Sequence, residues 1–173
     1  MKKVLMTFVT FLVICVTIWL QINFLDSIPL AGVTANIGIV LIAGLGLVSG
    51  KIIGGVTGII YGLLIDVAIY RTFGVYTLLY ASAGMISGFL NNSFSKENKI
   101  SMVMLILFVT IAFETLVYIL HLLLNHFEFQ FSVLLMVLIL ESAYNMLLTI
   151  LLFKPITFLG DILNRCKNSY YLL

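Results

Sequence analysis

Two glutamates lie inside long apolar runs, Glu114 in the run 100–124 and Glu141 in the run 130–153. Two carboxyl groups on consecutive apolar runs resemble the general acid–base pair of a hydrolase, but only in residue type. No nearby residue supplies a nucleophile with an orienting base, so the pair does not predict an enzyme. Each charge near the middle of a membrane would cost at least about 2.5 kcal/mol. We expect protonation or hydrogen bonding to relieve this cost.

Other polar residues accompany the glutamates at helical spacing, so each run carries a polar stripe. We expect the stripes to face each other, a partner or a wet cavity, and to avoid lipid. The alternatives are a buried hydrogen-bonded network that fixes helix packing, a partner surface, or a ligand or proton site. The stripes consist of Thr110, Glu114, Tyr118 and His121, and of Glu141, Asn145 and Thr149.

A second pattern is a line of glycines at every fourth position, which ends on an acid, in the stretch GGVTGIIYGLLID. Residues four apart share one helix face, so the glycines form a groove that admits another helix. That helix belongs either to this chain or to another membrane protein. The acid is either a structural anchor or a cavity or partner contact. The residues are Gly54, Gly58, Gly62 and Asp66, with Gly84 and Gly88 repeating the spacing farther on.

Metal and disulfide chemistry are not indicated. His121, His126 and Glu128 have irregular spacing, so we expect loop residues rather than a metal site. Cys15 and Cys166 are too far apart in the expected topology to form a disulfide. We predict no cofactor.

The elements that must position these residues are membrane helices. The chain is 62% hydrophobic and 9% charged, with a mean hydropathy of +1.22, whereas soluble domains are about 25% charged. A net charge of +2 does not indicate nucleic-acid binding. We therefore predict an all-α polytopic membrane protein, a compact bundle of six transmembrane helices in one domain, 1–173.

The expected spans are set by the apolar runs, and polar links separate them. The second and third are near the lower length limit for crossing, so a re-entrant hairpin is the alternative for this pair. The first span begins with Lys2-Lys3 and an apolar run, as a signal peptide does, but no small-residue cleavage site follows the run. We therefore expect this span to be retained. The spans cover about 4–24, 30–49, 53–70, 73–91, 100–124 and 130–153, followed by a short tail, 154–173.

The basic residues orient this arrangement. If both termini are cytoplasmic, Arg71 alone among the nine Lys and Arg residues lies outside, as the positive-inside rule favours. We predict a multi-pass protein of the cytoplasmic membrane.

The stretch GGVTGIIYGLLIDVAIYRTFGVYTLLYASAGMISGF (54–89) and the final run ESAYNMLLTILLFKP (141–155) resemble the rod shape-determining protein MreD family of bacteria. The resemblance rests on size, six short spans and matching positions across about 30–155. These positions are Gly58, Gly62, Leu63, Leu64, Asp66, Gly74, Tyr80, Gly84, Gly88, Asn145 and Pro155.

The resemblance implies a non-enzymatic component of the elongation machinery that guides side-wall peptidoglycan synthesis. The partners that it implies are a membrane-anchored MreC-like protein, the actin-like MreB filament, and the glycosyltransferase–transpeptidase pair. An oligomeric state does not follow from it.

A second family has a similar architecture: the substrate-binding S component of energy-coupling-factor vitamin transporters. Its members often carry an Ala-x-x-x-Ala pair in the first span, whereas VLMTFVTFLVICVTIWLQ (4–21) contains no alanine or glycine. A solute site could still be built from Asp66, Glu114 and Asn145, so this family remains the alternative.

Overall fold

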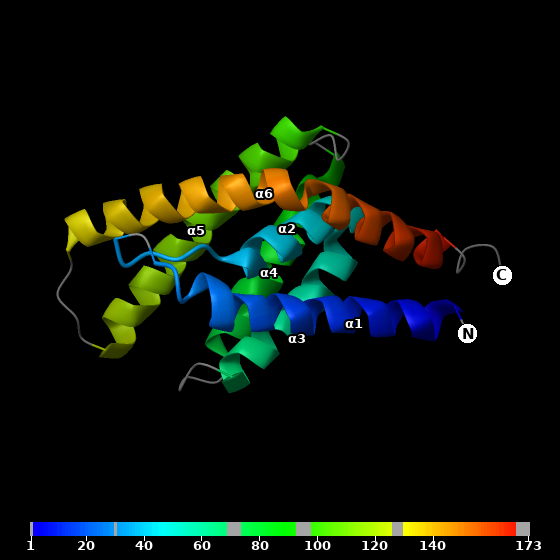
Figure 1. Ribbon diagram of the computed structural model, residues 1–173, viewed down its shortest axis with the longest axis horizontal. Coiled ribbons are helices and arrows are strands. Elements are labelled where there is room, and N and C mark those ends of the chain that lie inside the picture. Colours follow the sequence, from blue (N-terminus) through cyan, green and yellow to red (C-terminus); the bar gives the residue numbers. More distant parts are fainter. Residues whose placement is uncertain (1, 30, 69–73, 93–97, 126–129, 169–173) are drawn as a thin grey trace.

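The computed structural model describes residues 2–29, 31–68, 74–92, 98–125 and 130–168. Every regular segment in these ranges is helical, which confirms the all-α class (Figure 1). The long helices are α1 (Lys2–Leu20), α2 (Ile37–Ser49), α3 (Lys51–Ala68), α4 (Val75–Phe89), α5 (Lys99–Asn125) and α6 (Phe131–Asn168). The π-helical turn η1 (Gln21–Leu25) extends α1, and the 3₁₀ turn η2 (Leu90–Asn92) follows α4.

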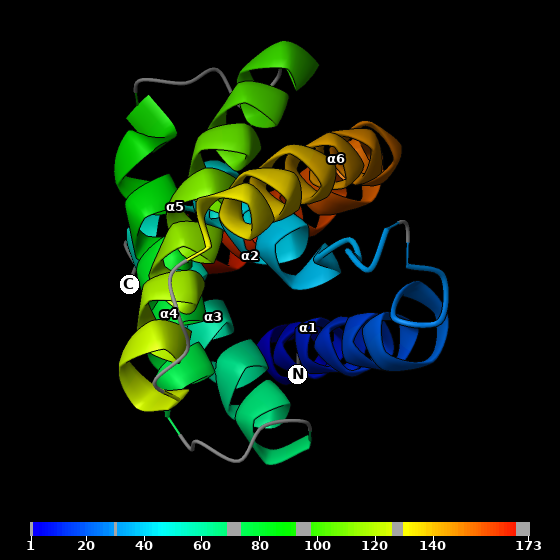
Figure 2. The same ribbon diagram turned by 90° about the vertical axis from the view of Figure 1, so that its left-hand side faces the viewer.

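Helix α2 forms the centre of the bundle. All of its residues, Ile37–Ser49, are buried, and it contacts α1 and α3 to α6. Figure 2 shows it surrounded by the other helices. A helix that is apolar on every side must be covered on every side, and neighbouring helices supply that cover here.

Four described helices are long and apolar enough to cross a membrane, whereas α2 and α4 are shorter apolar helices. At 1.5 Å per residue, α2 is about 20 Å long and α4 about 23 Å, below the ~30 Å of a hydrocarbon core. A membrane bundle is supported, and six full crossings stay a prediction. The four candidate segments are Phe8–Leu25, Lys51–Ala68, Lys99–Leu123 and Phe131–Asn164.

The helix expected from residue 30 begins only at Ile37, so the expected boundary was wrong. Ala31 and Gly32 have positive φ values of 52° and 81°, a conformation that no α-helix contains. The Asn36 side chain then accepts a hydrogen bond from Ile39 N at 3.2 Å and caps the helix. The described residues before α2 therefore form an irregular segment.

Helix α6 continues past Pro155, where the last span was expected to end, and reaches Asn168. Packing against α2 explains the continuation. The Ile156 side chain lies against Gly44 and is 1% exposed, and Asn164 Nδ2 donates to Val48 O at 2.9 Å. These tertiary contacts hold the C-terminal half of α6 in helical form despite the missing proline N–H.

Helix α1 begins and α6 ends at the same end of the molecule (Figure 1). Termini on one side of the membrane require this arrangement. The cytoplasmic placement of both ends stays a prediction.

Candidate functional site

The glycine line lies at the contact between α3 and α4. A Cβ atom added at Gly58 would lie 2.9 Å from Ala81 Cα and closer still to the Tyr80 carbonyl group. Gly54 meets the backbone of Gly84 in the same way. Backbone atoms cannot yield as a flexible side chain would. Helix α4 of the same chain therefore occupies the groove.

The two ends of this contact are equally close. Gly62 lies against the backbone of Thr77 and Tyr76, and Gly88 lies against Lys51. Small residues at every turn let the two backbones approach, which supplies van der Waals packing in a bilayer.

Asp66 joins the C-terminal end of α3 to the beginning of α4. Its carboxylate accepts hydrogen bonds from the backbone N–H groups of Gly74, Tyr76 and Thr77 at 3.0–3.1 Å and from Thr77 Oγ1 at 2.6 Å. The side chain is 2% exposed. A carboxylate at a helix N-terminus satisfies free N–H groups and complements the helix dipole. Arg71, five positions farther along the chain, lies outside the described residues.

Glu114 on α5 and Glu141 on α6 are brought together. The Glu141 carboxyl group lies close enough to the side chains of Glu114, Asn145 and Asn36 to interact with them electrostatically. Glu141 is 6% exposed, and Glu114 is half-buried. The polar stripes of the two helices thus meet at this point, and a third element reaches them through Asn36.

Asn36 connects α2 to these stripes. Its backbone N–H donates to Asn145 Oδ1 at 2.8 Å, and its Oδ1 accepts from the Tyr80 hydroxyl group at 2.9 Å. Asn145 Nδ2 in turn donates to Thr110 Oγ1 at 3.1 Å. Asn145 and Thr110 are fully buried. Asn36 therefore joins α2, α4 and α6, and Asn145 extends the network to α5.

Gln21 fixes the irregular segment from the other side. Its Oε1 accepts from Ile37 N at 3.0 Å, and its Nε2 donates to Ala35 O at 2.9 Å and to Asp26 Oδ1 at 2.8 Å. One amide thereby satisfies backbone groups at the start of α2. We call the connected set the polar junction: Gln21, Asn36, Tyr80, Thr110, Glu114, Glu141 and Asn145.

Asn36 and Gln21 are members of this junction that the polar stripes did not predict. Their signal was present, because both are amides at the edges of apolar runs that flank Pro29 and Gly32. Amides at such positions are suited to satisfy backbone groups where the helix is interrupted.

Tyr118 and His121 take other positions on α5. The Tyr118 hydroxyl group accepts from Gln130 N at 2.9 Å and donates to Gln130 O at 3.1 Å, so it ties α5 to the segment that precedes α6. His121 is exposed. The expected stripe on α5 is therefore divided between the junction and the link to α6.

A polar cavity of about 150 Å³ adjoins the junction. Its walls come from the η1 region, the irregular segment, α3, α4, α5 and α6. Non-helical backbone at membrane depth is tolerated where it is enclosed by protein or lines a cavity, and Thr34, Ala35 and Asn36 do line it. The lining residues are Gln21, Asp26, Thr34, Ala35, Asn36, Ile65, Tyr76, Tyr80, Phe113, Glu114, Val117 and Glu141.

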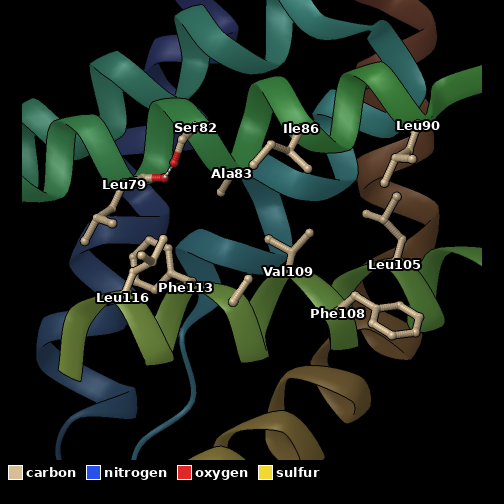
Figure 3. A pocket seen from close by; sticks show the side chains of 11 residues that line it. Leu79, Ser82, Ala83, Ile86, Leu90, Leu105, Phe108, Val109, Phe113 and Leu116 are labelled. Atoms are coloured by element: carbon tan, nitrogen blue, oxygen red, sulfur yellow. Dashed lines mark hydrogen bonds between the residues drawn. The ribbon is translucent and has the colours of Figure 1, made fainter. Parts of the chain in front are cut away.

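A second hollow, of about 380 Å³, lies between α4 and α5 and is lined almost entirely by apolar side chains (Figure 3). Its one hydroxyl group, on Ser82, donates to Leu79 O at 2.8 Å. This groove therefore suits an apolar occupant and offers little with which to orient a polar ligand.

The two hollows differ in the chemistry that they can support. The groove between α4 and α5 offers hydrocarbon contact. The polar cavity offers carboxyl, amide and phenol groups and three aromatic rings. Among the described residues, no three His, Cys, Asp or Glu side chains are arranged to hold a metal ion.

Comparison with known proteins adds one match. The sequence profile of the family described as rod shape-determining protein MreD matches residues 1–160. No curated protein and no solved structure matches the chain.

Proposed function

Since the chain belongs to the MreD family of rod shape-determining proteins, we propose that it is a non-enzymatic membrane scaffold of the bacterial elongation machinery. It would help to position side-wall peptidoglycan synthesis and so maintain rod shape. Its proposed partners are an MreC-like membrane protein, the MreB filament and the glycosyltransferase–transpeptidase pair. The family match over residues 1–160 is the observation that carries this proposal.

Helix–helix contact within the bilayer is the proposed means of binding. Large apolar side chains are exposed along α1, including Phe8 at 60% and Trp19 at 62%. A partner helix can pack on such faces through van der Waals contact. The proposed arrangement is one integral domain with six inserted helices and both termini in the cytoplasm. The glycine line contributes indirectly, because it shapes the bundle that presents these faces.

The polar junction supports a structural role better than catalysis. The side chains of Asn36, Asn145 and Gln21 satisfy backbone groups at the start of α2. Groups that are already paired in this way order helices. We infer no enzymatic activity from them.

The vitamin-transporter alternative meets an obstacle of size. Pockets for drug-sized ligands usually measure about 300–1,000 Å³, whereas the polar cavity measures about 150 Å³. The cavity is thus small for a vitamin. The larger groove between α4 and α5, about 380 Å³, has an almost wholly apolar lining. Family membership and the small size of the polar cavity therefore both favour the scaffold.

Depletion of the protein from a rod-shaped host tests the proposal. We expect the cells to become round and to lyse even when vitamins are abundant, because side-wall synthesis would lose its guidance. Microscopy and growth on limiting vitamins measure the two outcomes. Re-expression of the wild-type chain is the control and should restore rods. Depleted cells that stay rod-shaped and starve only when vitamins are scarce would overturn the scaffold in favour of the transporter.

A further inference from the structure

The polar cavity has walls that are rich in acceptors. Three carboxyl groups line it, from Asp26, Glu114 and Glu141, and no lysine, arginine or histidine is among its lining residues. Glu141 is 6% exposed, so little water competes with a guest for its oxygen atoms. A positively charged guest would stabilise the ionised form of these carboxyl groups, and no basic lining residue competes for that role.

The aromatic residues in the walls indicate which type of cation the cavity suits. The rings of Tyr76, Tyr80 and Phe113 line the same cavity. The Tyr80 ring lies centrally, with centroid distances of 4.8 Å to Phe113 and 6.4 Å to Tyr76. Aromatic faces attract organic cations, and the attraction grows when the site is desolvated. Carboxyl groups beside such rings are suited to an ammonium group on an alkyl chain.

Size and access agree with this guest. The volume of about 150 Å³ is below that of pockets for drug-sized ligands, so one short alkylammonium is accommodated. Among the lining residues, Asp26 is exposed and Glu141 is buried. We therefore expect a guest to enter the cavity beside Asp26. This end lies where α1 finishes, opposite the end where α6 finishes (Figure 1).

We propose that the cavity between the irregular segment and the Glu114–Glu141 pair binds one alkylammonium group. The ammonium group donates up to three hydrogen bonds to the carboxyl and amide oxygens, and the alkyl chain lies against the aromatic rings. The group can come from a free small amine or from a lysine side chain of a partner protein. The second source rests on the proposed scaffold function, and the first does not.

The binding test uses the full-length protein in detergent, with n-butylammonium chloride as the probe. We expect a saturable rise in the unfolding temperature and a binding isotherm by calorimetry. Sodium chloride controls for ionic strength, and 1-butanol controls for the alkyl chain. A rise reproduced by either control would overturn the proposal.

Two charge-removing variants locate the site. Glu114→Gln and Glu141→Gln should each weaken butylammonium binding at least tenfold. The matched control Asp161→Asn removes an exposed carboxylate from α6 outside the cavity and should leave the affinity unchanged. Affinity that is equal in all three variants would refute the site.

A labelling experiment covers the case in which a glutamine variant fails to fold. Thr34 lines the cavity and is only half-buried. In a background without the native cysteines, Thr34→Cys should react with a thiol reagent at least fivefold more slowly when butylammonium is present. Butanol should not protect it. Unchanged labelling in butylammonium would count against the cavity.

The MreC-like partner separates the two sources. If its lysine fills the cavity, the partner should protect Thr34→Cys, and butylammonium should lower partner recovery. If a free amine is the guest, butylammonium should bind while partner recovery stays constant. Either result supports the ammonium site, and absence of amine binding together with absence of partner protection overturns it. Normal rods after depletion would instead remove the scaffold function alone.

Discussion

The α3–α4 contact and the polar junction both join helices, the first through close backbone packing and the second through hydrogen bonds. Along α3 and α4, glycines allow backbone to meet backbone, and Gly58 leaves no room for a Cβ atom beside Tyr80 and Ala81. At the junction, Asn36 and Asn145 join segments through directed hydrogen bonds, and a cavity of about 150 Å³ remains. The α3–α4 contact is therefore filled by the chain itself and has no room for another helix or a ligand.

This difference indicates where stability and recognition are concentrated. Close backbone packing is intolerant of added volume, because its cost rises steeply when backbone atoms must move. Membrane hydrogen bonds average only about 0.6 kcal/mol each, so the junction can lose one bond at moderate cost. We therefore expect variants at the glycine contact to be the most severe, followed by those at Asp66 and then those at the junction.

The largest effect is expected from Gly58→Leu. The added side chain must displace the α4 backbone at Tyr80, so the loss should reach or exceed about 3 kcal/mol, the upper part of the range for overpacking. Thermal unfolding in detergent and the yield of monodisperse protein measure it.

The control for this variant is Ile59→Leu, which conserves volume on an exposed position of the same helix. It should unfold at the wild-type temperature. If Gly58→Leu also behaves like wild type, the tight α3–α4 contact does not govern stability.

The next effect is expected from Asp66→Ala. It removes the acceptor for three backbone N–H groups and for the Thr77 hydroxyl group. A buried donor left unsatisfied costs about 1–3 kcal/mol, and we expect a loss in this range. Amide hydrogen exchange should show faster opening at the beginning of α4 than in α5. Uniform exchange rates would contradict a local capping role.

The smallest effect is expected from Asn145→Leu, which approximately keeps the side-chain volume. It removes the bonds to Asn36 N and Thr110 Oγ1. Two membrane hydrogen bonds at about 0.6 kcal/mol each predict a loss of about 1 kcal/mol. Thermal unfolding measures the loss.

Thr115→Val is the comparison variant on α5, because the Thr115 hydroxyl group bonds only the local Ile111 carbonyl at 2.7 Å among the bonds described for it. It should change stability less than Asn145→Leu does. A larger loss at Asn145 than at Gly58 would reverse the comparison between the two regions.

Local pattern determined much of this protein from the sequence alone. Apolar runs predicted an all-helical membrane bundle, because hydrocarbon exposure and helical backbone bonding are properties of each segment. The four-residue spacing of Gly54, Gly58 and Gly62 placed them on one face. The resemblance to the MreD family rested on the same stretch, and the family match confirms it.

Tertiary structure decided which segments meet. Asn36 and Asn145 are 109 positions apart, and no periodicity within one helix specifies such a pair. Residues before Ile37 leave the helix because Gln21, Tyr80 and Asn145 together satisfy the irregular backbone and its Asn36 cap. Helix α6 passes Pro155 because α2 supports it at Gly44. These outcomes depend on contacts between distant elements, so the physical reason for them lies in the packed bundle.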